Sequence, residues 1–179
     1  MKIYLIALSL TLLSASPLLA QQYKAAQSST TFYSSTPLED IKATNKQGTA
    51  LFNGETGALA FRIPIKGFSF RKSLMQQHFN ENYMESDKYP NATFEGKLTG
   101  YDLGSQGTHD VEADGHLTIH GVTQRVKIPG KLILDNQGVT MTSKFKVKLE
   151  DYDISIPKVV FLNIAEVIDV DLNYQFKEM

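Results

Sequence analysis

Apolar residues alternate with polar ones in six separate runs of this sequence, and that period of two most constrains the fold. In the first run Leu59, Phe61 and Ile63 fall on one side, and Arg62 falls on the other. The other runs are Phe94 to Leu98, Leu117 to Ile119, Val126 to Ile128, Val139 to Leu149 and Ile168 to Phe176. Because side chains of a strand point alternately to opposite faces, each run predicts a strand with one apolar face.

Short turn signals separate these runs, at Asn53-Gly54, Gly104 to Gly107, His120-Gly121 and Asp135 to Gly138. They predict a mainly antiparallel meander of about eight strands. Such strands hide their apolar faces either by closing into a barrel or by stacking as a sandwich. Closure also removes exposed edges, and a barrel of about eight strands has room for packed side chains or one small ligand.

Two segments before the first clear run are less regular. Thr31-Phe32-Tyr33 combines β-branched and aromatic residues, which predicts an opening edge strand. Thr36 to Gln47 begins near a proline, and its Leu38 and Ile41 indicate a short turn of helix.

The first twenty residues have the layout of a secretory signal peptide: a charged start, a short apolar core and a small residue at the end. We therefore expect residues 1–20 to be removed and residues 21–179 to form one domain outside the cytoplasm, periplasmic or secreted, with no stable membrane insertion. The chain has no cysteine, which excludes disulfides and thiolate metal sites. Its 18 basic and 19 acidic residues give no electrostatic case for nucleic acid as a partner.

Histidines are the first candidates for a metal site. His116 and His120 share a face, but on a strand they lie about 13 Å apart, so both are expected on the outer face of a hairpin. His78 with Glu81 and Glu85 is a better group, since residues three and four apart converge on a helix. No second cluster supplies further ligands, so the sequence predicts no metal site.

Catalytic patterns are equally sparse. The acidic group Glu150, Asp151 and Asp153 fits no calcium loop and falls where a strand ends, so a solvated turn is expected. No serine lies in a nucleophile-elbow sequence, and no glycine-rich phosphate loop follows a strand. We therefore predict no catalytic residues and no enzyme, with a hydrolase or metal-dependent enzyme that uses His78 as the weakest alternative.

One apolar segment, Ser73 to Ser86 (SLMQQHFNENYMES), differs from the strands around it. At about 100° per residue, a helix here places Leu74, Met75 and Phe79 on one face, together with His78 and Asn82. Such a face suits the mouth of an apolar cavity, where methionine adapts to irregular shapes and a few polar groups hold a ligand's head. A plug that completes a filled core needs the same residues, and the sequence leaves both readings open.

Two longer stretches of the sequence are distinctive: GFSFRKSLMQQHFNENYMESDKYPNATFEGKL, residues 67–98, and the hairpin GHLTIHGVTQRVKIPGKL, residues 115–132. Both resemble the YceI family. Within them the matching features are a Phe-rich strand, a lid-like segment with His78, Tyr89-Pro90 before the next strand, and the hairpin Leu117 to Thr123. The chain departs from the family pattern in AAQSSTTFYSS, near its start, and in Arg71-Lys72-Ser73. The resemblance implies a secreted bacterial protein with an all-β fold, an antiparallel eight-stranded lipocalin-like β-barrel with a short helical lid segment.

The resemblance also implies a binding protein that holds an isoprenoid or other lipid in the barrel lumen, for carriage or storage. The partner expected is this apolar molecule, with no other cofactor; a filled-core interaction module and a homodimer stay open as alternatives. The residues expected in the lumen are Phe61, Ile63, Phe68, Phe70, Phe94, Leu117, Ile119, Phe145, Val170 and Leu172. Those expected at the lid and mouth are Leu74, Met75, His78, Phe79, Asn82 and Met84.

Overall fold

The computed structural model describes residues 21–136, 138–157 and 163–179, so the expected signal peptide lies outside the described residues. The strands of this part of the chain are β1 (Gln22–Ser35), β2 (Asp40–Asn45), β3 (Thr49–Asn53), β4 (Ala58–Pro64), β5 (Phe68–Phe70), β6 (Asn91–Thr99), β7 (Gly107–Ile119), β8 (Val122–Asp135), β9 (Gly138–Lys148) and β10 (Val167–Glu178). The helical elements are the 3-10 helices η1 (Ile65–Gly67) and η3 (Leu149–Tyr152), the α-helix α1 (Ser73–His78) and the π-helix η2 (Phe79–Tyr83). In the described ranges no helix is long and apolar enough to cross a membrane.

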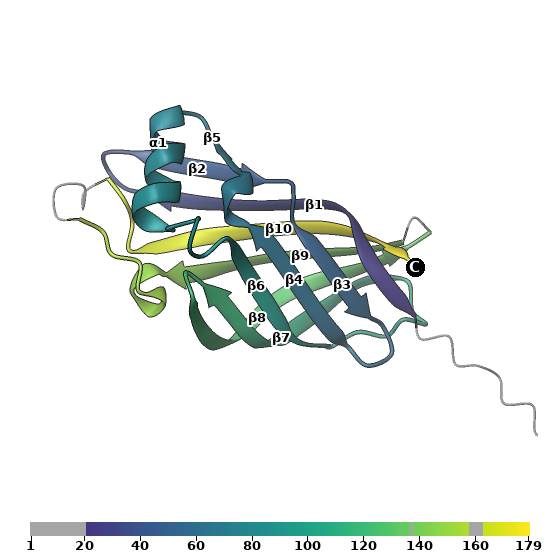
Figure 1. The fold of residues 1–179 in the computed structure, drawn as a ribbon. Helices are drawn as coiled ribbons and strands as arrows, with labels where there is room; N and C mark the ends of the chain where they lie inside the picture. Colours follow the sequence, from purple (N-terminus) through teal and green to yellow (C-terminus); the bar gives the residue numbers. More distant parts are fainter. Residues whose placement is uncertain (1–20, 137, 158–162) are drawn as a thin grey trace, which may run out of the picture.

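Eight of the strands form a closed antiparallel ring in the order β1, β3, β4, β6, β7, β8, β9 and β10. The ring closes where β10 returns to β1, in a register that runs from Tyr23 opposite Glu178 to Tyr33 opposite Asp169 (Figure 1). This confirms the predicted barrel. The expectation of an edge strand at Thr31 to Tyr33 is wrong, because β1 is paired on both sides.

β2 and β5 extend the ring at one end, beside the second half of β1. β2 replaces the short helix expected over Thr36 to Gln47, because pairing with β1 on one side and β5 on the other outweighs a weak local helix signal. Buried Asn45, at the end of β2, connects this strand to the end of β4 and to the loop that follows β2. Its Nδ2 donates to the Pro64 carbonyl at 2.6 Å, and its Oδ1 accepts from the Gln47 N–H at 2.7 Å.

The period of two in the sequence corresponds to the inner and outer faces of the barrel wall. Leu59 and Phe61 turn inward on β4, as predicted, and the outer face carries charged pairs between neighbouring strands. Lys144 Nζ of β9 lies 2.7 Å from the Asp171 carboxylate of β10, opposite it in the register. The alternation therefore separates an apolar interior from a charged exterior.

One end of the barrel, near the β3–β4 and β8–β9 turns, is filled by side chains. Phe52, Leu132 and Phe176 are each at most 2% exposed there, and Tyr174 is fully buried beside Phe61, with ring centroids 4.9 Å apart. The interior is thus packed at this end, and α1 lies at the opposite end, away from the C-terminus (Figure 1).

Candidate functional site: an apolar cavity in the barrel

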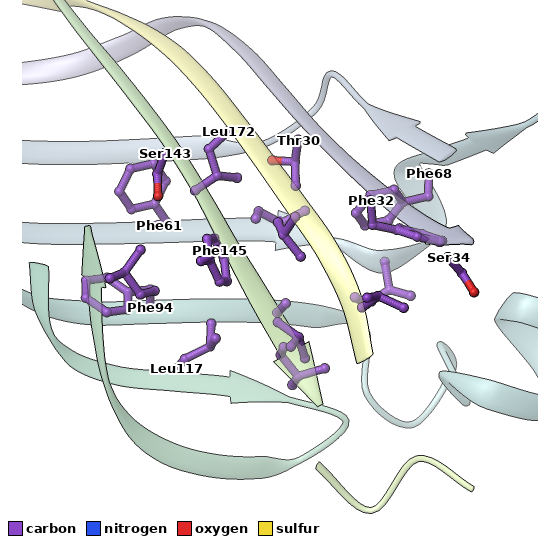
Figure 2. A pocket seen from close by; sticks show the side chains of 18 of the residues that line it. Thr30, Phe32, Ser34, Phe61, Phe68, Phe94, Leu117, Ser143, Phe145 and Leu172 are labelled. Atoms are coloured by element: carbon purple, nitrogen blue, oxygen red, sulfur yellow. The ribbon is translucent and has the colours of Figure 1, made fainter. Parts of the chain in front are cut away.

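The barrel encloses a cavity of about 440 Å³ between the packed end and α1. All ten residues predicted for the lumen border it, from five different strands and β5. Figure 2 shows six of them, Phe61, Phe68, Phe94, Leu117, Phe145 and Leu172, around the same space. The structure therefore places the whole predicted lumen set around one cavity.

Few polar side chains reach this cavity, and the two deepest are satisfied within the protein. Thr30 Oγ1 and the Tyr174 hydroxyl form a buried hydrogen bond of 3.0 Å, and burial raises the pKa of Tyr174 despite that bond. Nearer the α1 end, Ser34 Oγ accepts the Ala165 N–H at 2.8 Å. An apolar molecule inside the cavity would therefore leave the deep polar pair undisturbed.

Four phenylalanine rings close the cavity toward α1, and we call them the aromatic cap: Phe32, Phe68, Phe70 and Phe79. Phe79 is the link between them, with ring centroids 5.4 Å from Phe32, 5.6 Å from Phe68 and 5.0 Å from Phe70. Offset and edge contacts at these distances are the favourable geometries for aromatic rings. The cap makes the helical segment part of the cavity wall, which is one of the two readings that its apolar residues left open.

Within the helical segment, the predicted lid and mouth residues divide into two groups. Met75, Phe79 and Met84 border the cavity, as does His78, which is otherwise exposed. Leu74 is 60% exposed and Asn82 is also exposed, and neither borders the cavity. The apolar face is therefore centred on Phe79 rather than on Leu74.

The helix geometry explains why Met84 borders the cavity and Asn82 does not. The Met84 N–H donates to the Phe79 carbonyl five residues earlier, at 2.9 Å, so the second half of the segment is a π-helix. A π turn holds one residue more than an α turn, which rotates all later side chains relative to a 3.6-residue period. Met84 comes to the inner side in this way and Asn82 moves to the outer side.

The histidine and acidic candidates do not converge. Glu81 accepts from the Gln77 amide at 3.2 Å, whereas Glu85 lies 2.9 Å from His120 Nε2. Among the residues that the structure describes, no group of three or more His, Asp or Glu side chains is placed to hold a metal ion. His78 therefore belongs to no such metal-binding group in this part of the chain.

His120 differs from its prediction. It lies at the two-residue β7–β8 turn, where its φ is +51° and that of Gly121 is +78°, as a type I′ turn requires. The expectation of an outer-face residue is wrong, because the side chain is 10% exposed and packs edge-on against Tyr89 at 4.6 Å. His116, by contrast, is exposed, as expected.

Sequence reasoning missed the contribution of β1. Thr30, Phe32 and Ser34 all border the cavity, from a segment rich in Ser and Thr (Figure 2). Their spacing of two residues was a signal, but small hydroxyl residues do not mark an apolar face. Ile41 of β2 and Tyr83 of η2 also border the cavity and were not in the predicted set.

An eight-stranded antiparallel barrel closed around an apolar cavity places the protein in the lipocalin-like class of folds. Within that class, the model of the YceI-like domain matches residues 22–176, and the chain belongs to this family.

Solved structures agree with this fold. The chain is similar to a polyisoprenoid binding domain from Saccharophagus degradans implicated in plant cell wall breakdown, with 15% identity, a TM-score of 0.75, and coverage of 88% of this chain and 98% of that chain. It is also similar to Burkholderia cenocepacia BcnA, with 17% identity, a TM-score of 0.67, and coverage of 82% and 94%. A Campylobacter jejuni YceI protein shares 18% identity, with a TM-score of 0.58 and coverage of 79% and 86%. A search of the curated proteins gave no match.

Proposed function

We propose that this protein is a non-enzymatic binder that holds one apolar chain, an isoprenoid or a fatty lipid, in the barrel cavity for carriage or storage outside the cytoplasm. The observation that carries the proposal is the cavity itself, about 440 Å³ and bordered by aromatic and aliphatic side chains from almost every strand. The name of the polyisoprenoid binding domain, a protein of similar fold, supports the same ligand class.

The cavity volume also suggests a ligand length. If a methylene-sized group occupies about 30 Å³, roughly the share of one water in the liquid, the cavity accepts a chain of about 15 carbon atoms. Each methylene removed from water contributes about 0.8 kcal/mol, so a chain of this size binds without any charged contact. Three isoprene units or a fatty chain of similar length fit this description.

The first experiment is organic extraction of the protein purified without detergent, followed by mass spectrometry. We expect a co-purified lipid that is lost in Phe94→Arg, because Phe94 is 6% exposed and borders the cavity. Leu51→Arg is the matched control, since Leu51 is 51% exposed and its change leaves the cavity untouched. Circular dichroism must show that both variants are folded.

A second measurement does not depend on what co-purifies. The chain has no tryptophan, so Phe145→Trp adds a single reporter at the cavity wall. Energy transfer from this tryptophan to cis-parinaric acid, an 18-carbon fatty acid, is expected to saturate. Ala113→Leu, which fills part of the cavity without adding charge, is expected to weaken that binding. No saturable transfer, together with no extracted lipid, would refute the proposal.

A further inference from the structure

The barrel wall is incomplete between β8 and β9. These strands pair only where Gly130 to Asp135 faces Gly138 to Ser143. Beyond that point, and among the residues that the structure describes, Val122 to Pro129 is paired with β7 alone, and Lys144 to Lys148 is paired with β10 alone. We call the space between these two unpaired stretches the lateral opening.

The cavity lies next to one end of this opening. Alternation along β8 and β9 points Ile128, Gly130 and Ser143 inward, which leaves Pro129, Lys131 and Thr142 on the outer face. Those three outer residues nevertheless border the cavity, at the point where β8 and β9 separate. The cavity is therefore adjacent to the lateral opening as well as to the aromatic cap.

Side-chain contacts define both ends of the lateral opening. At its inner corner the Ser143 hydroxyl donates to the Pro129 carbonyl at 2.6 Å. At its other end, Gln124 Nε2 donates to the Asp151 carbonyl of η3 at 2.9 Å. The opening is thus a bounded gap in the wall rather than a frayed sheet.

Backbone groups along the opening lack a neighbouring strand. In an antiparallel ladder, alternate residues direct their N–H and C=O groups to each side, so half of those in the two unpaired stretches face the gap. Pro129 fits this position, because proline within a strand is tolerated where the edge is free. A polar group placed in the gap would find donors and acceptors already arranged.

Basic residues occupy the outer faces of the two strands that border the gap. We call five of them the cationic rim: Arg125 and Lys127 beside the opening on β8, Lys144 and Lys146 beside it on β9, and Lys131, which lies in the paired stretch of β8 just past the inner corner. Each has an acidic partner on the neighbouring strand away from the gap: Asp110, Glu112 and Asp114 on β7, and Asp169 and Asp171 on β10. Lys148 pairs instead with Glu150 in η3, at the end of the opening. A group in the gap therefore meets these cations only when such exposed ion pairs open, which costs little.

We propose that the lateral opening holds the anionic head, a phosphate or carboxylate, of the molecule whose tail fills the cavity. The inference rests on the proposed function, since it assumes a luminal tail. Lys144 is the first unpaired residue of β9, and Lys131 lies just past the Ser143–Pro129 hydrogen bond on β8; these two lysines are the primary head contacts. Cations on a flexible stem form the charge-assisted hydrogen bonds that recognise such a head.

The test compares two ligands with the same 15-carbon tail, farnesol and farnesyl phosphate, by titration of the Phe145→Trp protein. Farnesyl phosphate is expected to bind about five- to tenfold more tightly. The double variant Lys131→Gln, Lys144→Gln is expected to abolish this preference, so that the two ligands bind it with similar affinity. Lys72→Gln is the matched control, because Lys72 is a paired lysine at the α1 end, 2.7 Å from Glu39, which borders the cavity there.

Each outcome separates the two proposals. If neither ligand binds, the luminal binding itself fails. If both bind equally, or if Lys72→Gln removes the preference and the double variant does not, the head is not in the lateral opening and the inference is wrong. Inorganic phosphate alone is the third arm: we expect no saturable binding, and saturable binding without a preference for farnesyl phosphate would indicate a surface ion site instead.

Discussion

His120 Nε2 lies 2.9 Å from the Glu85 carboxylate, and this contact ties the turn between β7 and β8 to the end of the helical segment. The other ring nitrogen, Nδ1, lies 3.2 Å from the Tyr152 carbonyl in η3. One imidazole thus joins three elements that are distant in the sequence, at the same end of the barrel as the aromatic cap.

Loss of this contact should loosen the helical segment. We expect Glu85→Ala to speed amide hydrogen exchange in residues 73–86, because the variant lacks the carboxylate that holds this segment to the β7–β8 turn. Glu85→Gln is the conservative control, since its amide can still donate to the ring, and exchange should stay near the parent rate. Equal exchange in all three proteins would show that the contact does not hold the segment.

The aromatic cap should account for much of the stability at the α1 end. Phe79→Ala removes three ring contacts and is expected to lower the free energy of unfolding by about 2–4 kcal/mol. Leu74→Ala, in the same helical segment but 60% exposed, should change it by less than about 0.5 kcal/mol. Urea denaturation measures both, and similar losses from the two variants would contradict the inward placement of Phe79.

The cavity also depends on two glycines that face each other across β6 and β7. Gly96 is paired with Gly115, and the Phe94 ring lies over them, so a Cβ on Gly115 would come within 2.6 Å of Gly96 Cα and 2.8 Å of Phe94 Cζ. Gly115→Ala should therefore cost about 1–3 kcal/mol of stability, because both backbone and ring must shift. Gly104→Ala, in an exposed turn, serves as the control, and thermal unfolding compares them.

Tyr174 makes stability fall at high pH. Burial raises its pKa above the usual value near 10, so the phenol stays neutral in the folded barrel while it ionises in the unfolded chain. Its contribution is complete below pH 10 and is lost as the pH rises through the folded pKa. We expect Tyr174→Phe to show a shallower loss of melting temperature between pH 9 and pH 11 (about the usual tyrosine range). An unchanged slope would exclude this tyrosine as a cause.

The alternation predicted the strands and their apolar faces because it is local, but it left a barrel and a sandwich open, and the family resemblance implied the barrel. Phe61 and Phe94 lie in runs whose period of two depends only on neighbouring residues and not on the order of the strands. Both residues border the cavity. The register that closes the ring cannot be read in this way. β1 looked like an edge because Ser and Thr conceal its inner face, and its pairing with β10 joins residues more than 130 positions apart.

The helical segment and the lateral opening show two further limits. A period of 3.6 residues cannot anticipate the π turn after Phe79, which moved Asn82 outward. His120 is buried because residues distant in the sequence, Glu85 and Tyr152, contact its ring. Pro129 was a usable signal for a free strand edge within an apparently central strand, and it was overlooked.

The pairing of the first strand with the last also has a consequence for how the chain folds. β1 cannot form this pairing until β10, more than 130 positions later in the chain, is available. Contacts between sequence-distant strands make folding slow, because the loop entropy is lost before those contacts form. The enclosed cavity therefore forms only when β10 pairs with β1; before that step the strands are an open sheet without an interior.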